Sequence, residues 1–323
     1  MQNHDLTTST SLRSSSLEIS TNPANMVNSL SFATALVSLA VLGAAQKCPL
    51  VFDSRVPTAM TAATLDTDQS PFNPAFVKGK GLNFSQIVKL SPASSMFDMK
   101  ALTQTVTVTI NETSIFQPSD TAKAQTGFRR AELLATSNDG TDPSTLGVKM
   151  LHFSIQKDAA HPLNLSHEYM FSWLETNKYD NDQWNLRGGN LLDQKVPAGD
   201  PDTLMFFGSS QYYKPGTVAP LLFQTKFTPA VWHNFGVLMD FNKNLTQVYY
   251  SKNADPLKNV TALLPNDVSG QGQYHFGLLK KPVNLGSGVV QYDGTQESPM
   301  FEGISYGGIF VEDSSTNCMS MAP

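Results

Sequence analysis

Short segments in which apolar and polar side chains alternate recur after Cys48, and clusters of Gly, Pro, Asn and Asp separate them. A two-residue period is that of a β-strand with one buried face. No long segment has the i, i+3, i+4, i+7 apolar spacing of an amphipathic helix. The chain is therefore predicted to be all-β, as two stacked antiparallel sheets. The predicted strands include residues 103–110, 127–134, 149–157, 167–175, 231–241, 245–251, 274–279 and 305–311.

The N-terminal part does not fit this pattern. Residues 30–45, LSFATALVSLAVLGAA, form an apolar run that ends in small residues. The run is shorter than the roughly 20 residues that span a bilayer, but it matches the apolar core and cleavage site of a secretory signal peptide. A signal anchor is the alternative. Residues 1–25 precede Met26, which begins a signal sequence of its own. We expect residues 1–45 to be removed, and residues 46–323 to be one secreted, monomeric domain without a membrane contact.

The two cysteines, Cys48 and Cys318, lie near the ends of the predicted domain. In a secreted protein they are expected to form one disulfide, whereas in a cytosolic protein they would be free thiols. Five N-x-[ST] sequons, which are potential glycosylation sites, support secretion. They are Asn83, Asn111, Asn164, Asn244 and Asn259.

Composition excludes several classes of partner. Charged residues make up 15% of the 323 residues, against roughly 25% in an average soluble domain, and the formal net charge is −5. Lys and Arg are scattered, so nucleic acid is excluded as a partner. The chain has no His-x-His or H-E-x-x-H arrangement and no phosphate-binding glycine loop, so no metal and no cofactor is predicted. A calcium site at Asp180, Asn181 and Asp182 is the remaining alternative.

The segment 167–175, HEYMFSWLE, has three aromatic residues at alternate positions. Aromatic rings beside polar groups match the C–H face and the hydroxyls of a pyranose, so this face is predicted to bind sugar. The opposite face, with Met170, Ser172 and Leu174, is then the core face. The alternative is that the aromatic face forms the core and the face with Met170 and Leu174 is exposed to solvent. Under strict alternation the sugar-binding face holds His167, Tyr169, Phe171, Trp173 and Glu175.

The segment 127–134, GFRRAELL, is the most charge-dense part of the chain. Arg130 and Glu132 are two residues apart, so they project from the same face of a strand. An Arg beside a Glu holds the carboxylate ionised, whereas burial or a second carboxylate raises its pKa toward that of a general acid. The alternative is a surface ion pair worth at most about 1 kcal/mol.

Glycoside hydrolysis needs two carboxylates that flank the scissile bond, and Glu132 and Glu175 are the predicted pair. Glu168 is the alternative second carboxylate, although alternation turns it inward with Met170 and Leu174. His152 is predicted to point with the pair, if the three strands are neighbours, and to orient a carboxylate or a water. Gln156, on the same face as His152, and Arg130 are expected to give polar support.

Five motifs together resemble those of glycoside hydrolase family 131, whose members are secreted fungal β-glucanases. The resemblance covers nearly the whole chain from Cys48 to Cys318. It implies a β-jelly-roll sandwich with a concave cleft that hydrolyses β-1,3, β-1,6 and β-1,4 glucan linkages. The motifs are CPLVFDSRVP (48–57), GFRRAELL (127–134), WHNFGVLMDF (232–241), HFGLLKKP (275–282) and YGGIFVEDS (306–314).

The resemblance also implies a pair of catalytic glutamates. The first falls on Glu132, and the second on Glu175 or, if the register differs by one residue, on Glu168. An open cleft leaves room for a water between the carboxylates, so inversion is expected. The residues expected to line the glucan subsites are Tyr169, Phe171, Trp173 and Trp184.

Two other functions fit the same residues. The R-x-E pattern on a jelly roll also resembles polysaccharide lyases that act on uronates, with Tyr169, His152, Arg130 and Gln156 in the catalytic roles. A non-catalytic glucan-binding protein would use the same aromatic face. In the favoured interpretation the partner is a β-glucan polysaccharide.

Overall fold

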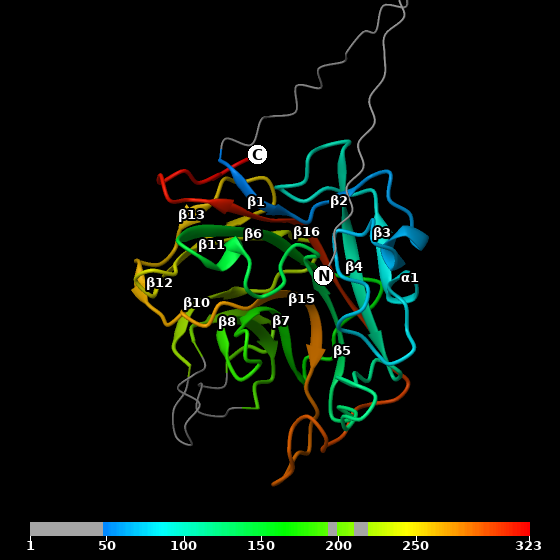
Figure 1. Ribbon diagram of the computed structural model, residues 1–323. Coiled ribbons are helices and arrows are strands. Elements are labelled where there is room, and N and C mark those ends of the chain that lie inside the picture. The colour runs from blue at the N-terminus through cyan, green and yellow to red at the C-terminus, as the bar shows by residue number, and fades with distance from the viewer. Residues whose placement is uncertain (1–47, 193–198, 210–218) are drawn as a thin grey trace, which may run out of the picture. The chain divides into compact units, whose positions relative to one another are not determined.

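Two antiparallel β-sheets lie one above the other in the computed structural model, which describes residues 48–192, 199–209 and 219–323 (Figure 1). The all-β fold predicted from the alternating segments is confirmed. The helical elements among the described residues are one α-turn, α1 (Phe84–Ile87), and two 3-10 turns, Ala63–Asp66 and Pro143–Thr145. None of the helices in the described ranges is long and apolar enough to cross a membrane. The predicted N-terminal extension and signal peptide, residues 1–45, lie outside the described residues.

The larger sheet has ten strands. They are β1 (Leu50–Asp53), β2 (Val56–Pro57), β3 (Val88–Ser91), β4 (Thr103–Asn111), β6 (Val148–Lys157), β11 (His233–Asp240), β12 (Leu245–Lys252), β13 (Lys258–Asn259), β14 (Leu264–Pro265) and β16 (Phe301–Asp313). Their order is β13-β12-β11-β6-β16-β4-β2, with β14 beside β12, β1 beside β16 and β3 beside β4. Every pairing is antiparallel, which allows one face of a sheet to be buried and the other to stay open.

The smaller sheet has six strands in the order β10-β9-β8-β7-β15-β5. They are β5 (Arg129–Leu134), β7 (Glu168–Glu175), β8 (Asp182–Gly189), β9 (Thr203–Phe207), β10 (Leu221–Lys226) and β15 (Gln273–Lys280). The charged β5 segment and the aromatic β7 segment, which are far apart in the sequence, thus lie on either side of β15.

The core fills the space between the two sheets. Phe153 of the larger sheet stacks on Phe235 with ring centroids 5.2 Å apart, and Phe276 of the smaller sheet meets Phe153 edge-on at 5.6 Å. Each fully buried aromatic or aliphatic side chain of this kind contributes roughly 1.5–3 kcal/mol. Trp184 also belongs to this core, where it stacks on Phe206 at 5.1 Å.

A β-bulge in β7 changes which side chains face the core. The register with β8 shifts between Met170 and Ser172. Phe171 lies in the core, and the next residue, Ser172, pairs with the core residue Leu186. Two consecutive residues therefore face inward, and alternation resumes one residue out of phase. The prediction that one face carries all the aromatics of this strand is wrong: Tyr169 and Phe171 are core residues, whereas Trp173 and Glu175 point outward.

A disulfide joins Cys48 to Cys318 across 270 residues of chain, so the predicted pairing is confirmed. It ties the segment before β1 to the segment after β16, and these two strands pair with each other in the larger sheet. Beyond Cys318, the side chains of Met319 and Met321 pack against a second apolar cluster that includes Phe97, Met150 and Phe310.

Replacing both cysteines with serine should lower the free energy of unfolding by about 5 kcal/mol, because a closed loop of this length removes much entropy from the unfolded chain. Guanidinium denaturation of the double variant and the wild type measures the difference. The single variant Ser315→Ala, in the exposed turn before Cys318, is the control. An unchanged midpoint in the double variant would contradict the stabilising role.

Candidate active site

The outer face of the smaller sheet, turned away from the larger sheet, carries a row of charged side chains. Ala131 and Leu133 of β5 face the core, so Arg130 and Glu132 face outward. On β15 the outward residue next to them is His275, since its neighbours in the strand, Tyr274 and Phe276, are in the core. The row continues through Glu175 of β7 to Asp182, Asn185 and Arg187 of β8.

Glu132 is the most enclosed carboxylate of this row, with no exposed surface. Arg130 binds it through two contacts, Nε–Oε1 at 2.6 Å and Nη2–Oε2 at 2.9 Å. Nδ1 of His275 lies 2.8 Å from Oε2. Burial raises the pKa of Glu132, but the charge and hydrogen bonds of Arg130 and His275 outweigh it and hold the pKa below its usual value. The alternative of an exposed surface ion pair is therefore wrong.

His275 connects two carboxylates. Its Nε2 lies 3.3 Å from Oε2 of Glu175, and its ring stacks on Trp173 with centroids 4.6 Å apart. Burial lowers the pKa of His275, yet Glu132 and Glu175 together raise it to about 9. The imidazole is thus protonated at neutral pH. The sequence carried a signal for this residue, because alternation in the 274–279 strand turns His275 opposite to Tyr274 and Phe276.

We expect His275 to titrate near pH 9 rather than near its ordinary value of 6.5. Because the folded pKa is the higher one, the charged histidine stabilises the fold fully below about pH 6.5, and this contribution of about 3 kcal/mol is lost as the pH rises through 9. NMR titration of the ring measures the pKa. In Glu132→Gln the pKa should fall, since one of the two carboxylates is gone. A wild-type pKa near 6.5 would overturn the bridging role.

Glu175 and Asp182 are the accessible carboxylates of the row. The side chain of Glu175 is 26% exposed, and Asp182 is partly exposed. The two residues are direct partners across β7 and β8. Nδ2 of Asn185 lies 3.3 Å from Oδ2 of Asp182. Burial raises the pKa of Asp182 to about 6; the charge of Arg187 opposes this rise and the charge of Glu175 adds to it.

Glu168, the alternative second carboxylate, lies apart from these groups. It points outward, contrary to the prediction that it faces inward, but it is enclosed by cations. Nζ of Lys281 lies 2.6 Å and Nη1 of Arg187 3.3 Å from its Oε1, and the backbone N–H of Leu192 donates to Oε2 at 2.7 Å. Burial raises the pKa of Glu168, but the two cations outweigh it and the pKa stays below its usual value. Glu168 is therefore ionised, and both of its carboxylate oxygens already have partners within the protein.

Two predicted supporting residues lie in the other sheet. His152 and Gln156 are on β6, whose neighbours are β11 and β16. His152 is buried on the far side of that sheet, where it stacks on Phe310 at 4.5 Å and its Nε2 lies 3.0 Å from Glu312. The prediction that these residues support the carboxylate pair is wrong, because the three strands are not neighbours. The predicted glucan contacts of Tyr169, Phe171 and Trp184 are wrong as well, since these rings fill the core.

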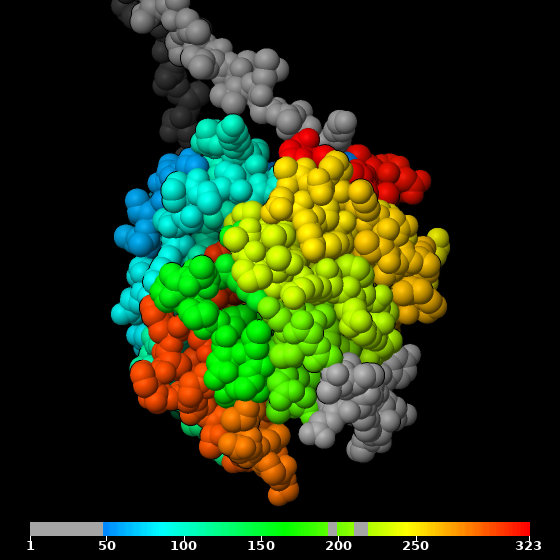
Figure 2. All heavy atoms as spheres, turned by 180° about the vertical axis from the view of Figure 1, so that it is seen from behind, coloured from blue at the N-terminus to red at the C-terminus, as the bar shows by residue number. Residues whose placement is uncertain are grey.

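The segment that joins β15 to β16, residues 281–300, covers part of the outer face. It is the orange segment that extends from the lower end of the molecule in Figures 1 and 2. Val290 packs on an apolar cluster of the outer face that includes Trp173 and Leu279. The backbone N–H of Gly127 donates to the carbonyl of Gln291 at 2.9 Å, which holds the segment against the residues before β5. The aromatic part of the face is therefore covered.

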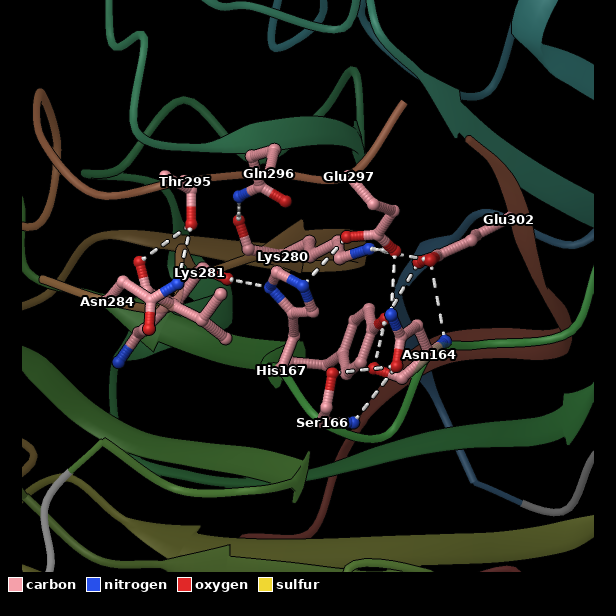
Figure 3. Close-up of polar contacts among 12 residues, drawn as sticks. Asn164, Ser166, His167, Lys280, Lys281, Asn284, Thr295, Gln296, Glu297 and Glu302 are labelled. Carbon is pink, nitrogen blue, oxygen red and sulfur yellow. Dashed lines mark hydrogen bonds and ion pairs between the residues drawn. The ribbon is translucent and has the colours of Figure 1, made fainter. Parts of the chain in front are cut away.

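A buried ionic cluster anchors both ends of this segment (Figure 3). Lys280 points inward at the end of β15, opposite to Lys281, and its ammonium contacts Glu297 and lies 2.6 Å from Glu302. The hydroxyl of Tyr169 donates to Glu302 at 2.8 Å, and Nε2 of His167 lies 2.7 Å from Glu297. This cluster explains why Tyr169 is buried although it has a polar end.

The part of the outer face at Glu175 and Asp182 adjoins a polar hollow of about 540 Å³. The hollow lies where β7 ends and β8 begins, and amide side chains are prominent in it. Tyr179, in the turn between these strands, has 66% of its surface exposed. The lining residues are Thr176, Asn177, Lys178, Asp180, Asn181, Gln183, Asp267, Ser269, Gly270 and Gln271. Among the described residues, no group of three or more His, Cys, Asp or Glu side chains is arranged to hold a metal ion.

Glu175 and Asp182 are cross-strand partners, and residues next to them in the chain, Thr176, Asn181 and Gln183, line the polar hollow. The family model of the glycoside hydrolase 131 catalytic N-terminal domain matches residues 50–317. The chain therefore belongs to glycoside hydrolase family 131 and is a glycoside hydrolase, which confirms the resemblance seen in the five motifs.

Two solved structures are similar to the chain. A GH131 β-glucanase catalytic domain from Podospora anserina has a TM-score of 0.61 and 17% identity, over 84% of this chain and 98% of that one. The catalytic domain of a family 131 protein from Coprinopsis cinerea has a TM-score of 0.59 and 18% identity, over 85% and 98%. Both show the fold, a jelly-roll-like β-sandwich. No curated protein matches the chain.

Proposed function

We propose that this glycoside hydrolase is secreted and cleaves β-glucan, with β-1,3, β-1,6 and β-1,4 linkages as its substrates, on the outer face of the smaller sheet. The observation that carries the proposal is the Glu132–His275–Glu175 arrangement, which places an accessible carboxylate against a protonated histidine. The disulfide supports secretion, because such bonds persist in oxidising compartments. The five sequons, Asn83, Asn111, Asn164, Asn244 and Asn259, are all at least partly exposed, which suits glycosylation.

In the proposed mechanism Glu175 is the carboxylate that acts at the sugar. His275 holds one of its oxygens and so orients the other toward a water molecule at the anomeric carbon; attack by that water inverts the configuration. Glu132 has no exposed surface, so it acts through His275, whose positive charge it maintains. Arg130 neutralises Glu132 in turn and is held by Oε1 of Gln125 at 2.9 Å. Glu132 is thus proposed as a positioning member of the predicted carboxylate pair.

The charge balance of the face favours a neutral sugar polymer over a uronate. Arg130 is bound to Glu132, and both Arg187 and Lys281 are bound to Glu168. Each of these three cations already has a buried carboxylate partner, so none of them is available to neutralise the carboxylate of a uronate. The lyase alternative also loses three of its proposed residues, since Tyr169 and His152 are buried away from this face and Gln156 lies on β6 of the larger sheet.

Incubation with laminarin, mixed-linkage glucan, cellulose and a polyuronate tests the function. We expect new reducing ends from the β-glucans without ultraviolet absorbance, and NMR of fresh digests should show the α-anomer first. Glu175→Gln should reduce the rate at least about 100-fold, because the base is removed. The control Asp255→Asn, in an exposed turn away from the smaller sheet, should retain activity. An unsaturated, absorbing product indicates a lyase, and binding without any product indicates a glucan-binding protein.

Tyr179 is proposed to replace the buried aromatics as the platform for a glucose unit beside the hollow. Tyr179→Ala should raise KM for long glucans several-fold, because a stacking contact is lost, and should leave kcat nearly unchanged. Steady-state kinetics on laminarin measures both values. Tyr292→Ala, whose ring lies under the ammonium of Lys123, is the control. An unchanged KM for Tyr179→Ala would remove this residue from the substrate path.

A further inference from the structure

Four carboxylates lie on the outer face of the smaller sheet in the described part of the chain, and they differ in access. Glu132 and Glu168 are enclosed, each by two cationic side chains. Glu175 and Asp182 have exposed surface. A group that gives a proton to the glycosidic oxygen has to reach it within hydrogen-bond distance. The accessible pair, Glu175 and Asp182, therefore contains the candidates for this role.

The neighbours of the two acids assign the proton to Asp182. Glu175 and Asp182 are cross-strand partners, and two carboxylates at such positions resist being ionised together. The protonated ring of His275 lies against Glu175, with its Nε2 3.3 Å from Oε2 of that acid. Because Glu175 faces the His275 cation and Asp182 faces Glu175, Asp182 is the member of the pair to which the proton is assigned.

The charges around Asp182 come from every strand of this part of the face. Glu175 of β7 favours the protonated form, whereas Arg187 of β8, His275 of β15 and Lys281 favour the ionised form. Burial is the largest influence and raises the pKa of Asp182 to about 6. Asp182 is thus a carboxylic acid in weakly acidic solution, which is the state that a proton donor needs.

We propose that Asp182 is the proton donor of the glucan-cleaving reaction, with Glu175 as the base. The proton on the Asp182 carboxyl passes to the glycosidic oxygen as the bond from C1 to that oxygen breaks. Glu175 takes a proton from the water whose oxygen forms the new bond to C1. One carboxyl loses a proton and the other gains one, and exchange with solvent restores both. This role rests on the proposed β-glucan hydrolysis.

The variant Asp182→Asn removes the proton but keeps the size of the side chain. On laminarin its kcat should fall about 100-fold or more. On a dinitrophenyl β-glucoside, whose leaving group departs without a proton, its kcat should stay within about tenfold of the wild type. The wild-type rate on laminarin should decline above about pH 6, and the residual rate of the variant should lack that decline. Asp255→Asn, in an exposed turn, is the matched control.

Two outcomes would overturn the role of Asp182. The first is a variant with near-normal activity on laminarin. The second is an equal loss on both substrates with the decline above pH 6 still present, which marks a structural role; circular dichroism of the variant checks its folding. These results differ from failure of the proposed function, in which the wild type itself releases no sugar from any β-glucan.

Discussion

The buried ion pair between Arg130 and Glu132 is the interaction on which the rest of the site depends. A carboxylate without solvent contact is costly unless cations and hydrogen bonds compensate it, and Glu132 has both Arg130 and His275. The requirement works in both directions, because the same carboxylate keeps His275 protonated. His275 in turn lies 3.3 Å from Glu175, the partly exposed acid beside it. The buried carboxylate of Glu132 thus helps to keep a cation, His275, on the outer face.

The segment 281–300 covers part of the outer face because contacts at both ends of the segment hold it there. Lys280 and Lys281 are adjacent in sequence, but strand alternation sends them to opposite sides of the sheet, where each meets glutamates. Lys280 anchors the segment 281–300 through Glu297 and Glu302, and Val290 of that segment covers Trp173. The polar end of the face, with Glu175, Asp182 and the hollow, is the part that is not covered in this way.

Much of the fold was predictable because strand formation is encoded locally. The alternating segments at 103–110, 149–157 and 245–251 became β4, β6 and β12 with ends shifted by at most one residue. Short or irregular strands such as β2 and β9 have too few residues for a clear period. The bulge in β7 was not predictable from alternation. One extra residue does not show in the pattern of residue types, but it reverses which side chains face the core beyond the bulge.

The sequence by itself determined the β class, the shared face of Arg130 and Glu132, the family and the two cysteines that pair. These features depend on residues close in the chain or on motifs of fixed order. Only the tertiary structure decided which histidine joins the carboxylates: His152 and His275 lie in equally strand-like segments, yet β6 entered the larger sheet and β15 lies between β5 and β7. Strand pairing is a long-range choice, made by how whole faces pack against each other, and local alternation contains no information about the partner strand.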